Sequence, residues 1–356
     1  MDVAAFCRES NVVVVVGKGG VGKTTVTAAL ARTAAAAGLD VLVTALDDSG
    51  GLPALFGRET PFGYDEVLLA TGTPAAGEDG SGPSDDGRAG ARVGARVAAG
   101  SGTGSRQARA RVPGRIRGRV LTSDAALVEY LADHGLGRVS RRLVQTGALE
   151  VVSTAIPGVR EMLVLARVKQ LERDGAADLV ILDAPATGHA VTFLTSSGGL
   201  ADAARGGPLR SQAEQVVEML SDPRRCQVLL VTLAEETPVN EVVETAYRLE
   251  DEVGVRLGPV VVNGCYPVLE ELDSDPSDAA RAAGAAQPSP GDTARIAAAA
   301  AFRSRRQELQ RLQLTRLARE LPLPRIELPY LFTAALGVND VESLSAALVA
   351  GIGALA

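Results

Sequence analysis

A glycine-rich loop between a β-branched run and an alanine-rich run is the feature that most constrains the fold of this chain. Residues 17–25 read GKGGVGKTT and contain the pattern G-x-x-x-x-G-K-[ST]. Val12–Val16 is an unbroken valine run, which is typical of a buried parallel strand. Thr25–Ala37 is rich in alanine and predicts a helix. A strand, a glycine loop and a helix in this order predict an α/β fold whose loop binds phosphate groups.

The loop predicts specific contacts with a nucleotide and a metal ion. Its glycines allow backbone N–H groups to point inward at a helix N-terminus, which favours anions. We expect Lys23 to reach the β- and γ-phosphates and the Thr24 hydroxyl to ligate Mg²⁺. The other residues expected to line the phosphates are Gly17, Gly19, Gly20, Val21, Gly22 and Thr25.

Lysine is scarce in this chain, yet two lysines lie in the loop. Of the 36 Lys and Arg residues 33 are arginine, and Lys18 and Lys23 are two of the three lysines. A compact ammonium differs from a broad planar guanidinium, so a tight phosphate site favours lysine. A phosphate loop needs one lysine, and two interpretations of Lys18 stay open. It is either a solvated loop charge or a second cation for the phosphates, offered across a dimer interface.

Charge and cysteine content exclude several other classes of protein. The net charge of −7 and the pI near 5.1 disfavour a nucleic-acid partner. The three cysteines are scattered, without a disulfide framework or metal-ligand spacing. The N-terminal residues do not resemble a signal peptide, and no run approaches the length of a membrane span. We therefore expect a cytoplasmic protein without a transmembrane segment.

Alternating strand and helix patterns predict one domain over residues 1–356, built on a mostly parallel sheet flanked by helices. Residues 71–119 are rich in Gly and Arg and predict a disordered insertion. Residues 120–175 and 190–222 read as helices and predict a helical subdomain inserted around the core. Residues 271–291 read as a loop before a long helix.

Carboxylates at the ends of two predicted strands suggest the second half of the site. Asp183 follows the apolar run Leu179–Leu182, where open α/β sheets place their ligands, so it is the expected partner of Mg²⁺. Residues 184–189, APATGH, form a small-residue turn that could move with a γ-phosphate. Asp47 and Asp48 end the second strand; they either orient the attacking water or are plain turn carboxylates.

Five segments together resemble the arsenical pump-driving ATPase family, which includes ATPases that target tail-anchored membrane proteins and bacterial anion-transporting ATPases. The resemblance covers most of the chain but does not extend to residues 71–119 or to about 267–300. It implies a P-loop NTPase that binds and hydrolyses ATP with Mg²⁺, forms a homodimer or a heterodimer with a paralogous ATPase, and serves a transport or membrane-protein partner. The segments are GKGGVGKTT, Asp47 after the second strand, DAPATGH at 183–189, TLAEETPVN at 232–240 and VVVNGCYP at 260–267.

The resemblance also implies residue roles. Lys18 would reach the nucleotide of the partner subunit, and Asp47 would polarise the attacking water in switch I. Asp183 would lie near magnesium. The remaining implied contacts are Thr187 and Gly188, with His189, in switch II, Asn263 at the adenine edge and Pro329 against the base.

Some departures from the family keep alternatives open. Asp48-Ser49-Gly50 replaces the Pro-Ala-His that often follows the switch I aspartate. Neither a Cys-x-x-Cys zinc pair nor an arsenite-binding cysteine triad is present. The alternatives are a degenerate nucleotide-binding subunit of a heterodimer, a partitioning-type ATPase and a small-molecule phosphotransferase.

Overall fold

The computed structural model describes residues 1–46, 51–71, 114–133, 135 and 158–355. Within these residues the chain forms an eight-stranded sheet, and every neighbouring pair of strands is parallel except β3 and β4. The predicted mostly parallel α/β fold is thereby confirmed. In spatial order the strands are β3 (Val67–Thr71), β4 (Arg115–Val120), β2 (Val41–Ala45), β5 (Leu179–Ala186), β1 (Val12–Gly17), β6 (Cys226–Leu233), β7 (Arg256–Cys265) and β8 (Arg325–Pro329).

Strand β1 occupies the middle of the sheet, between β5 and β6. Its five valines are all buried, because helices cover both faces of the sheet. Val13 and Val15 pack into the hydrophobic core on one face, and Val12, Val14 and Val16 pack into the core on the other. This central position places the glycine loop at the carboxyl edge of the sheet, where α/β folds bind ligands.

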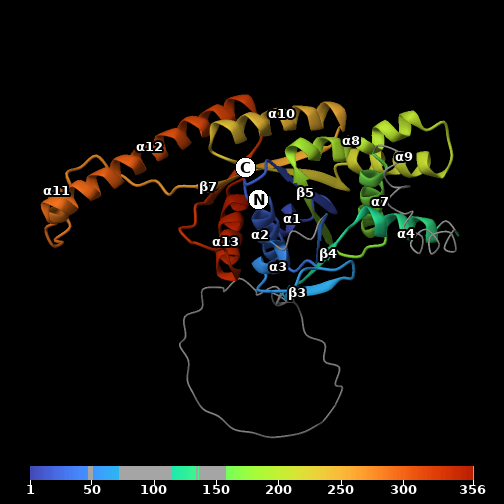
Figure 1. Cartoon of the computed structure of the whole chain (residues 1–356), viewed down its shortest axis with the longest axis horizontal. Helices are drawn as coiled ribbons and strands as arrows, with labels where there is room; N and C mark the ends of the chain where they lie inside the picture. The colour runs from blue at the N-terminus through green and yellow to red at the C-terminus, as the bar shows by residue number, and fades with distance from the viewer. Residues whose placement is uncertain (47–50, 72–113, 134, 136–157, 356) are drawn as a thin grey trace, which may run out of the picture.

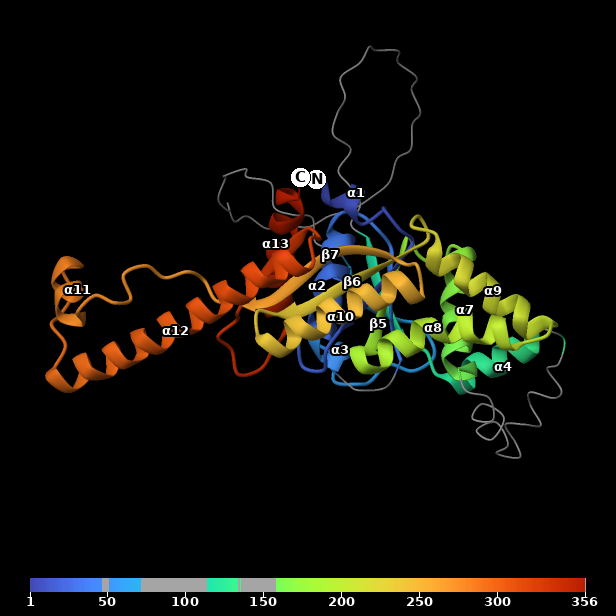
Figure 2. The same cartoon turned by 90° about the horizontal axis from the view of Figure 1, so that it is seen from above.

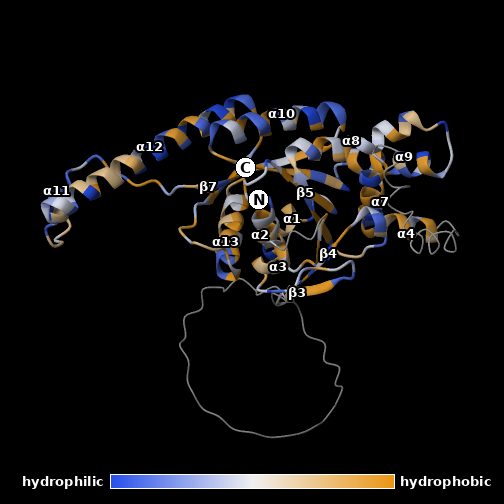
Figure 3. Cartoon of the chain, in the orientation of Figure 1, coloured by the Kyte–Doolittle hydropathy of each residue, from blue (hydrophilic) through white to orange (hydrophobic). Residues whose placement is uncertain are grey.

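Helices form an outer layer on each face (Figure 1). In Figure 3 the central strands carry mostly hydrophobic residues, whereas α12 mixes hydrophobic and hydrophilic residues. One face is covered by α1 (Val3–Phe6), α2 (Lys23–Ala36), α3 (Gly51–Leu55) and α13 (Val338–Ala354). The other is covered by α7 (Val159–Arg173), α8 (Thr187–Ala203), α9 (Pro208–Ser221), α10 (Glu236–Glu252) and the C-terminal part of α12 (Pro290–Glu320).

The helices predicted to form a subdomain pack together at one end of the molecule. They are α4 (Ser123–Asp133), α7, α8 and α9, and they share a small hydrophobic cluster that includes Met162, Leu200 and Ala213. Helix α8 begins at Thr187, directly after β5, and therefore joins the edge of the sheet to this helical end.

Helix α12 extends away from the sheet, with α11 (Pro276–Ala282) near its far end (Figures 1 and 2). The prediction of a loop over 271–291 was wrong for α11. The Asp275 side chain accepts the backbone N–H groups of Ser277 and Asp278, and Pro276 opens the helix. None of the described helices is both long and apolar enough to span a bilayer.

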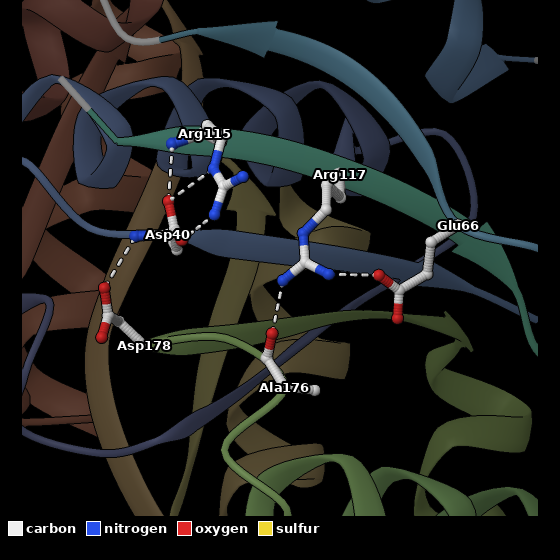
Figure 4. A network of polar contacts seen from close by, with 6 residues as sticks. All are labelled: Asp40, Glu66, Arg115, Arg117, Ala176 and Asp178. Atoms are coloured by element: carbon white, nitrogen blue, oxygen red, sulfur yellow. Dashed lines mark hydrogen bonds and ion pairs between the residues drawn. The ribbon is translucent and has the colours of Figure 1, made fainter.

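The expected insertion at 71–119 is too long at both ends. Thr71 belongs to β3, and residues 115–119 belong to β4; residues 72–113 lie outside the described part of the chain. Arg115 donates to both carboxylate oxygens of Asp40, and Arg117 donates to Glu66 and to the carbonyl of Ala176 (Figure 4). The composition misled the prediction because these arginines alternate with buried Ile116 and Gly118 along a strand.

Candidate functional site

The glycine loop lies where β1 ends at Gly17 and α2 begins at Lys23. The first turn of α2 holds no acidic side chain, so its backbone N–H groups remain a favourable place for an anion. Lys23 Nζ donates to the Lys18 carbonyl at 3.2 Å. Burial lowers the pKa of Lys23, and the nearby Asp183 carboxylate partly opposes this effect. The loop thus gathers a half-buried ammonium and a helix N-terminus at one point.

Thr24 and Asp183 meet beside the loop. Thr24 Oγ1 donates to Asp183 Oδ2 at 2.7 Å, because β5 pairs with β1 and places Asp183 opposite Val15. A hydroxyl and a carboxylate are the hard oxygen ligands that Mg²⁺ prefers, with water and phosphate oxygens completing its coordination. The described residues contain no group of three or more His, Cys, Asp or Glu that would hold a metal by protein ligands alone. The donor set therefore fits a magnesium ion bound together with phosphates.

Glu241, which the sequence did not single out, connects two of the predicted residues. Lys18 Nζ donates to Glu241 Oε1 at 2.5 Å, and Thr187 Oγ1 donates to Glu241 Oε2 at 3.3 Å. Glu241 lies on α10, which carries several acidic residues, so no local signal distinguishes it from the others. Lys18 is therefore ion-paired in this structure, and its side chain is 34% exposed.

Beside the loop lies a cavity of about 340 Å³, whose lining includes the loop residues 20–22 together with Asn263, Pro329 and Tyr330. Asn263 Nδ2 donates to the Val21 carbonyl at 3.0 Å. Gly22 has a φ of +90°, and a Cβ at this position would collide with Asn263 Nδ2. The loop and the end of β7 are therefore fitted closely together on one side of the cavity.

The sequence patterns also did not single out the aromatic residues beside this cavity. Tyr330 lines the cavity and stacks on Tyr266, with ring centroids 4.8 Å apart. Arg303 of α12 lies over the Tyr266 ring, 4.2 Å from its centroid. The signal for this arrangement in the sequence is weak, because Tyr330 follows Pro329 directly but Tyr266 and Arg303 are distant in the chain.

The remaining predicted residues divide into two groups. Asp47 and Asp48 lie outside the described residues. Thr187, Gly188 and His189 form the first turn of α8, and His189 is exposed. His189 and Pro185 line a separate cavity of about 350 Å³. The structure thus brings together Lys18, Lys23, Thr24, Asp183 and Thr187 around one edge of the sheet, with Asn263 and Pro329 beside them.

Two family models match the chain. Residues 12–62 match the CobQ/CobB/MinD/ParA nucleotide binding domain, and residues 134–202 match the anion-transporting ATPase model of the ArsA type. The first match contains the glycine loop, and the second ends within α8.

Several curated proteins are similar over most of the chain. ATPase BagA of Mycobacterium tuberculosis and a putative ATPase of Mycobacterium bovis are each 31% identical over 276 residues, which cover 76% of this chain and 68% of the relative. A putative arsenical pump-driving ATPase of Halobacterium salinarum is 27% identical over 282 residues, 73% of this chain and 36% of that protein. Together with the fold and the phosphate loop, these similarities show that the chain belongs to the ArsA-like family of P-loop ATPases.

Proposed function

We propose that this protein is a Mg²⁺-dependent ATPase that works as a nucleotide switch. The observation that carries the proposal is the 2.7 Å contact between Thr24 Oγ1 and Asp183 Oδ2, immediately beside Lys23 at the N-terminus of α2. A bound Mg²⁺ would neutralise phosphate charge and orient the terminal phosphate at this point. Lys23 would hold the β- and γ-phosphates, and the backbone of the glycine loop would cradle them.

The proposal takes adenine as the base, and a hydrogen bond of Asn263 supports this choice. Its Nδ2 donates one N–H to the Val21 carbonyl, and its amide oxygen would accept a hydrogen bond from a ligand in the cavity. At position 6 of the purine, an oxygen acceptor could accept from the amino group of adenine, whereas guanine carries a carbonyl oxygen there that cannot donate. This arrangement supports ATP over GTP, with Pro329 packing against the base.

The water-activating group in this proposal is Asp47. The family resemblance supports this role, since the residue follows β2, and β2 pairs with β5 next to Asp183. Thr187 and Gly188 would then respond to the γ-phosphate, because they begin α8 directly after β5. Through α8 such a response would reach the helical end of the molecule, where Leu200 packs with Met162 and Ala213.

We further propose that two subunits complete the active unit, either as a homodimer or with a paralogous ATPase. Lys18 supports this idea because it is a second, partly exposed ammonium in a loop that needs one lysine. To act on a partner subunit's nucleotide, Lys18 would have to leave Glu241. The same proposal includes a cytoplasmic location, which the cysteine content supports, and a transport or membrane-protein partner, which the family resemblance supports.

The test measures how fast the purified chain releases phosphate from ATP in the presence of Mg²⁺. The mass of the protein in solution, measured with and without ATP, reports whether it dimerises. We expect Lys23→Ala to abolish release and to weaken ATP binding strongly, and Lys23→Arg to lose activity as well because a guanidinium is too broad for the loop. Arg281→Ala on the remote helix α11 is the matched control and should leave release unchanged. Release that survives Lys23→Ala would refute the proposal, and binding without release would favour a degenerate subunit.

A further inference from the structure

Lys169, the lysine outside the phosphate loop, lies buried in the helical end of the molecule. It is 5% exposed and belongs to α7. Its Nζ donates to Gln212 Oε1 at 2.6 Å and to Gln215 Oε1 at 2.8 Å, both on α9. An ammonium carries three N–H donors, and within the described chain both of these acceptors are neutral amides. Among the described residues, no carboxylate therefore makes a hydrogen bond to the buried charge of Lys169.

This lysine borders a cavity of about 270 Å³ between α4, α7 and α9. The charged residues of its lining in the described part of the chain are Lys169, Arg167, Arg173 and Glu129. Glu129 is already paired, since its Oε2 lies 2.7 Å from Arg167 Nε. Three cations against one carboxylate make the lining net positive in a chain whose net charge is −7. Among the described residues, no carboxylate forms an ion pair with Lys169 or Arg173, so their charges remain for a ligand.

Burying an ammonium without an opposite charge costs free energy, and the neighbouring arginines increase this cost. Burial lowers the pKa of Lys169, and the charges of Arg173 and Arg225 lower it further, with Glu218 opposing them. Buried charges in proteins are normally paired or hydrogen-bonded to a charged partner. A bound anion would supply the missing partner.

We propose that this cavity is a binding site for a small oxyanion, a phosphate or a carboxylate. Lys169 would donate from the cavity wall, and the exposed Arg173 would offer its planar fork beside it. The Gln212 amide, whose oxygen accepts from Lys169, has its Nε2 donors left for the same ligand. The volume is just below the roughly 300 Å³ at which ligand pockets usually begin, so the ligand is smaller than a nucleotide or a peptide.

The site is separate from the phosphate loop and does not depend on the proposed ATPase function. Its lining comes from α4, α7 and α9, whereas the loop joins β1 to α2. Both sites should nevertheless bind inorganic phosphate, so the experiment uses the full-length Lys23→Ala chain without nucleotide as its background. Phosphate and citrate are each titrated by calorimetry, with sodium chloride holding the ionic strength constant.

We expect saturable binding of one anion per chain. Lys169→Met should weaken it by about tenfold or more, because a charge-assisted hydrogen bond is lost. Arg173→Gln should weaken it severalfold and, as a surface change, should keep the fold if Lys169→Met does not. The matched control is Arg210→Gln, an exposed arginine of α9 that pairs with Glu214 and does not line the cavity, and it should bind normally.

The two probes distinguish the class of ligand, since stronger binding of phosphate or of citrate identifies a phosphate or a carboxylate site. Absence of saturable binding for both probes would overturn the proposal. So would binding that neither Lys169→Met nor Arg173→Gln weakens, because the anion would then lie elsewhere. Addition of ATP to the wild-type chain should leave citrate binding in place, and competition between them would also contradict a separate site.

Discussion

Glu241 holds Lys18 of the phosphate loop at 2.5 Å and at the same time accepts a hydrogen bond from Thr187, the first residue of α8. One carboxylate of α10 therefore connects the glycine loop with α8, the helix that leads to the helical end. The ion pair with Glu241 thus fixes the position of Lys18 within its own subunit.

Lys18→Ala should lower the kcat of ATP hydrolysis more than tenfold, because a second cation beside the phosphates is lost. The free energy of unfolding should change by less than about 1 kcal/mol, since both side chains of the ion pair are one-third exposed. Steady-state kinetics and chemical denaturation measure the two effects. Glu241→Gln removes the same ion pair but keeps Lys18; an unchanged kcat in Lys18→Ala would show that the lysine does not act on the phosphates.

Asp183→Asn should retain ATP binding but require far more Mg²⁺ for hydrolysis, because a carboxylate beside the metal is replaced by a neutral amide. The matched control is Thr27→Val. It keeps the shape of a buried side chain and removes only a long hydrogen bond, 3.5 Å, from Thr27 Oγ1 to Asp183 Oδ1. Hydrolysis rates over a magnesium titration measure the difference. Equal magnesium requirements in Asp183→Asn and the wild-type chain would remove Asp183 from the metal site.

The sequence predicted most of the elements that carry the site, because each left a local pattern. The valine run of β1, the glycine loop and the strand that ends at Asp183 are short segments in which neighbouring residues suffice. The boundary of β4 was missed because the arginines of RIRGRV resemble the arginine-rich segment before them, although their alternation with Ile116 and Gly118 is a strand signal.

The contacts between distant segments could not be predicted in this way. Glu241 is one of several acidic residues on α10, and only the packing of α10 against α8 and the loop brings it to Lys18. Lys169 likewise has no local motif, and its burial follows from the packing of α7 against α9. Such pairs depend on tertiary structure, which hydrophobic periodicity does not encode.

Asp40→Asn should lower the melting temperature near neutral pH and have little effect in acid. Hydrogen bonds from Arg115 hold the pKa of Asp40 below its ordinary value of 3.8, although burial opposes them. A carboxylate with a depressed folded pKa stabilises the fold above its unfolded pKa and loses that effect as the pH falls through the folded pKa.

Thermal melts near neutral pH and below pH 3.8 should therefore show a difference between wild type and Asp40→Asn that shrinks in acid. Asp278→Asn, which removes an exposed carboxylate paired with Arg281 on α11, is the control and should change little at either pH. A difference that stays constant with pH would mean that the charge of Asp40 does not contribute.

Gly22→Ala should weaken ATP binding more than Gly20→Ala. Both glycines have a positive φ, near +90° and +86°, so alanine costs about 1–2 kcal/mol of backbone strain at either position. At Gly20 a Cβ meets nothing within 4 Å, whereas at Gly22 it collides with Asn263. Calorimetric titration of ATP into each variant measures the difference. The double variant Gly22→Ala with Asn263→Ala removes the collision. Its melting temperature should therefore be higher than that of Gly22→Ala alone, a non-additivity typical of residues in contact. Equal losses of ATP affinity in Gly22→Ala and Gly20→Ala would contradict the close fit between Gly22 and Asn263.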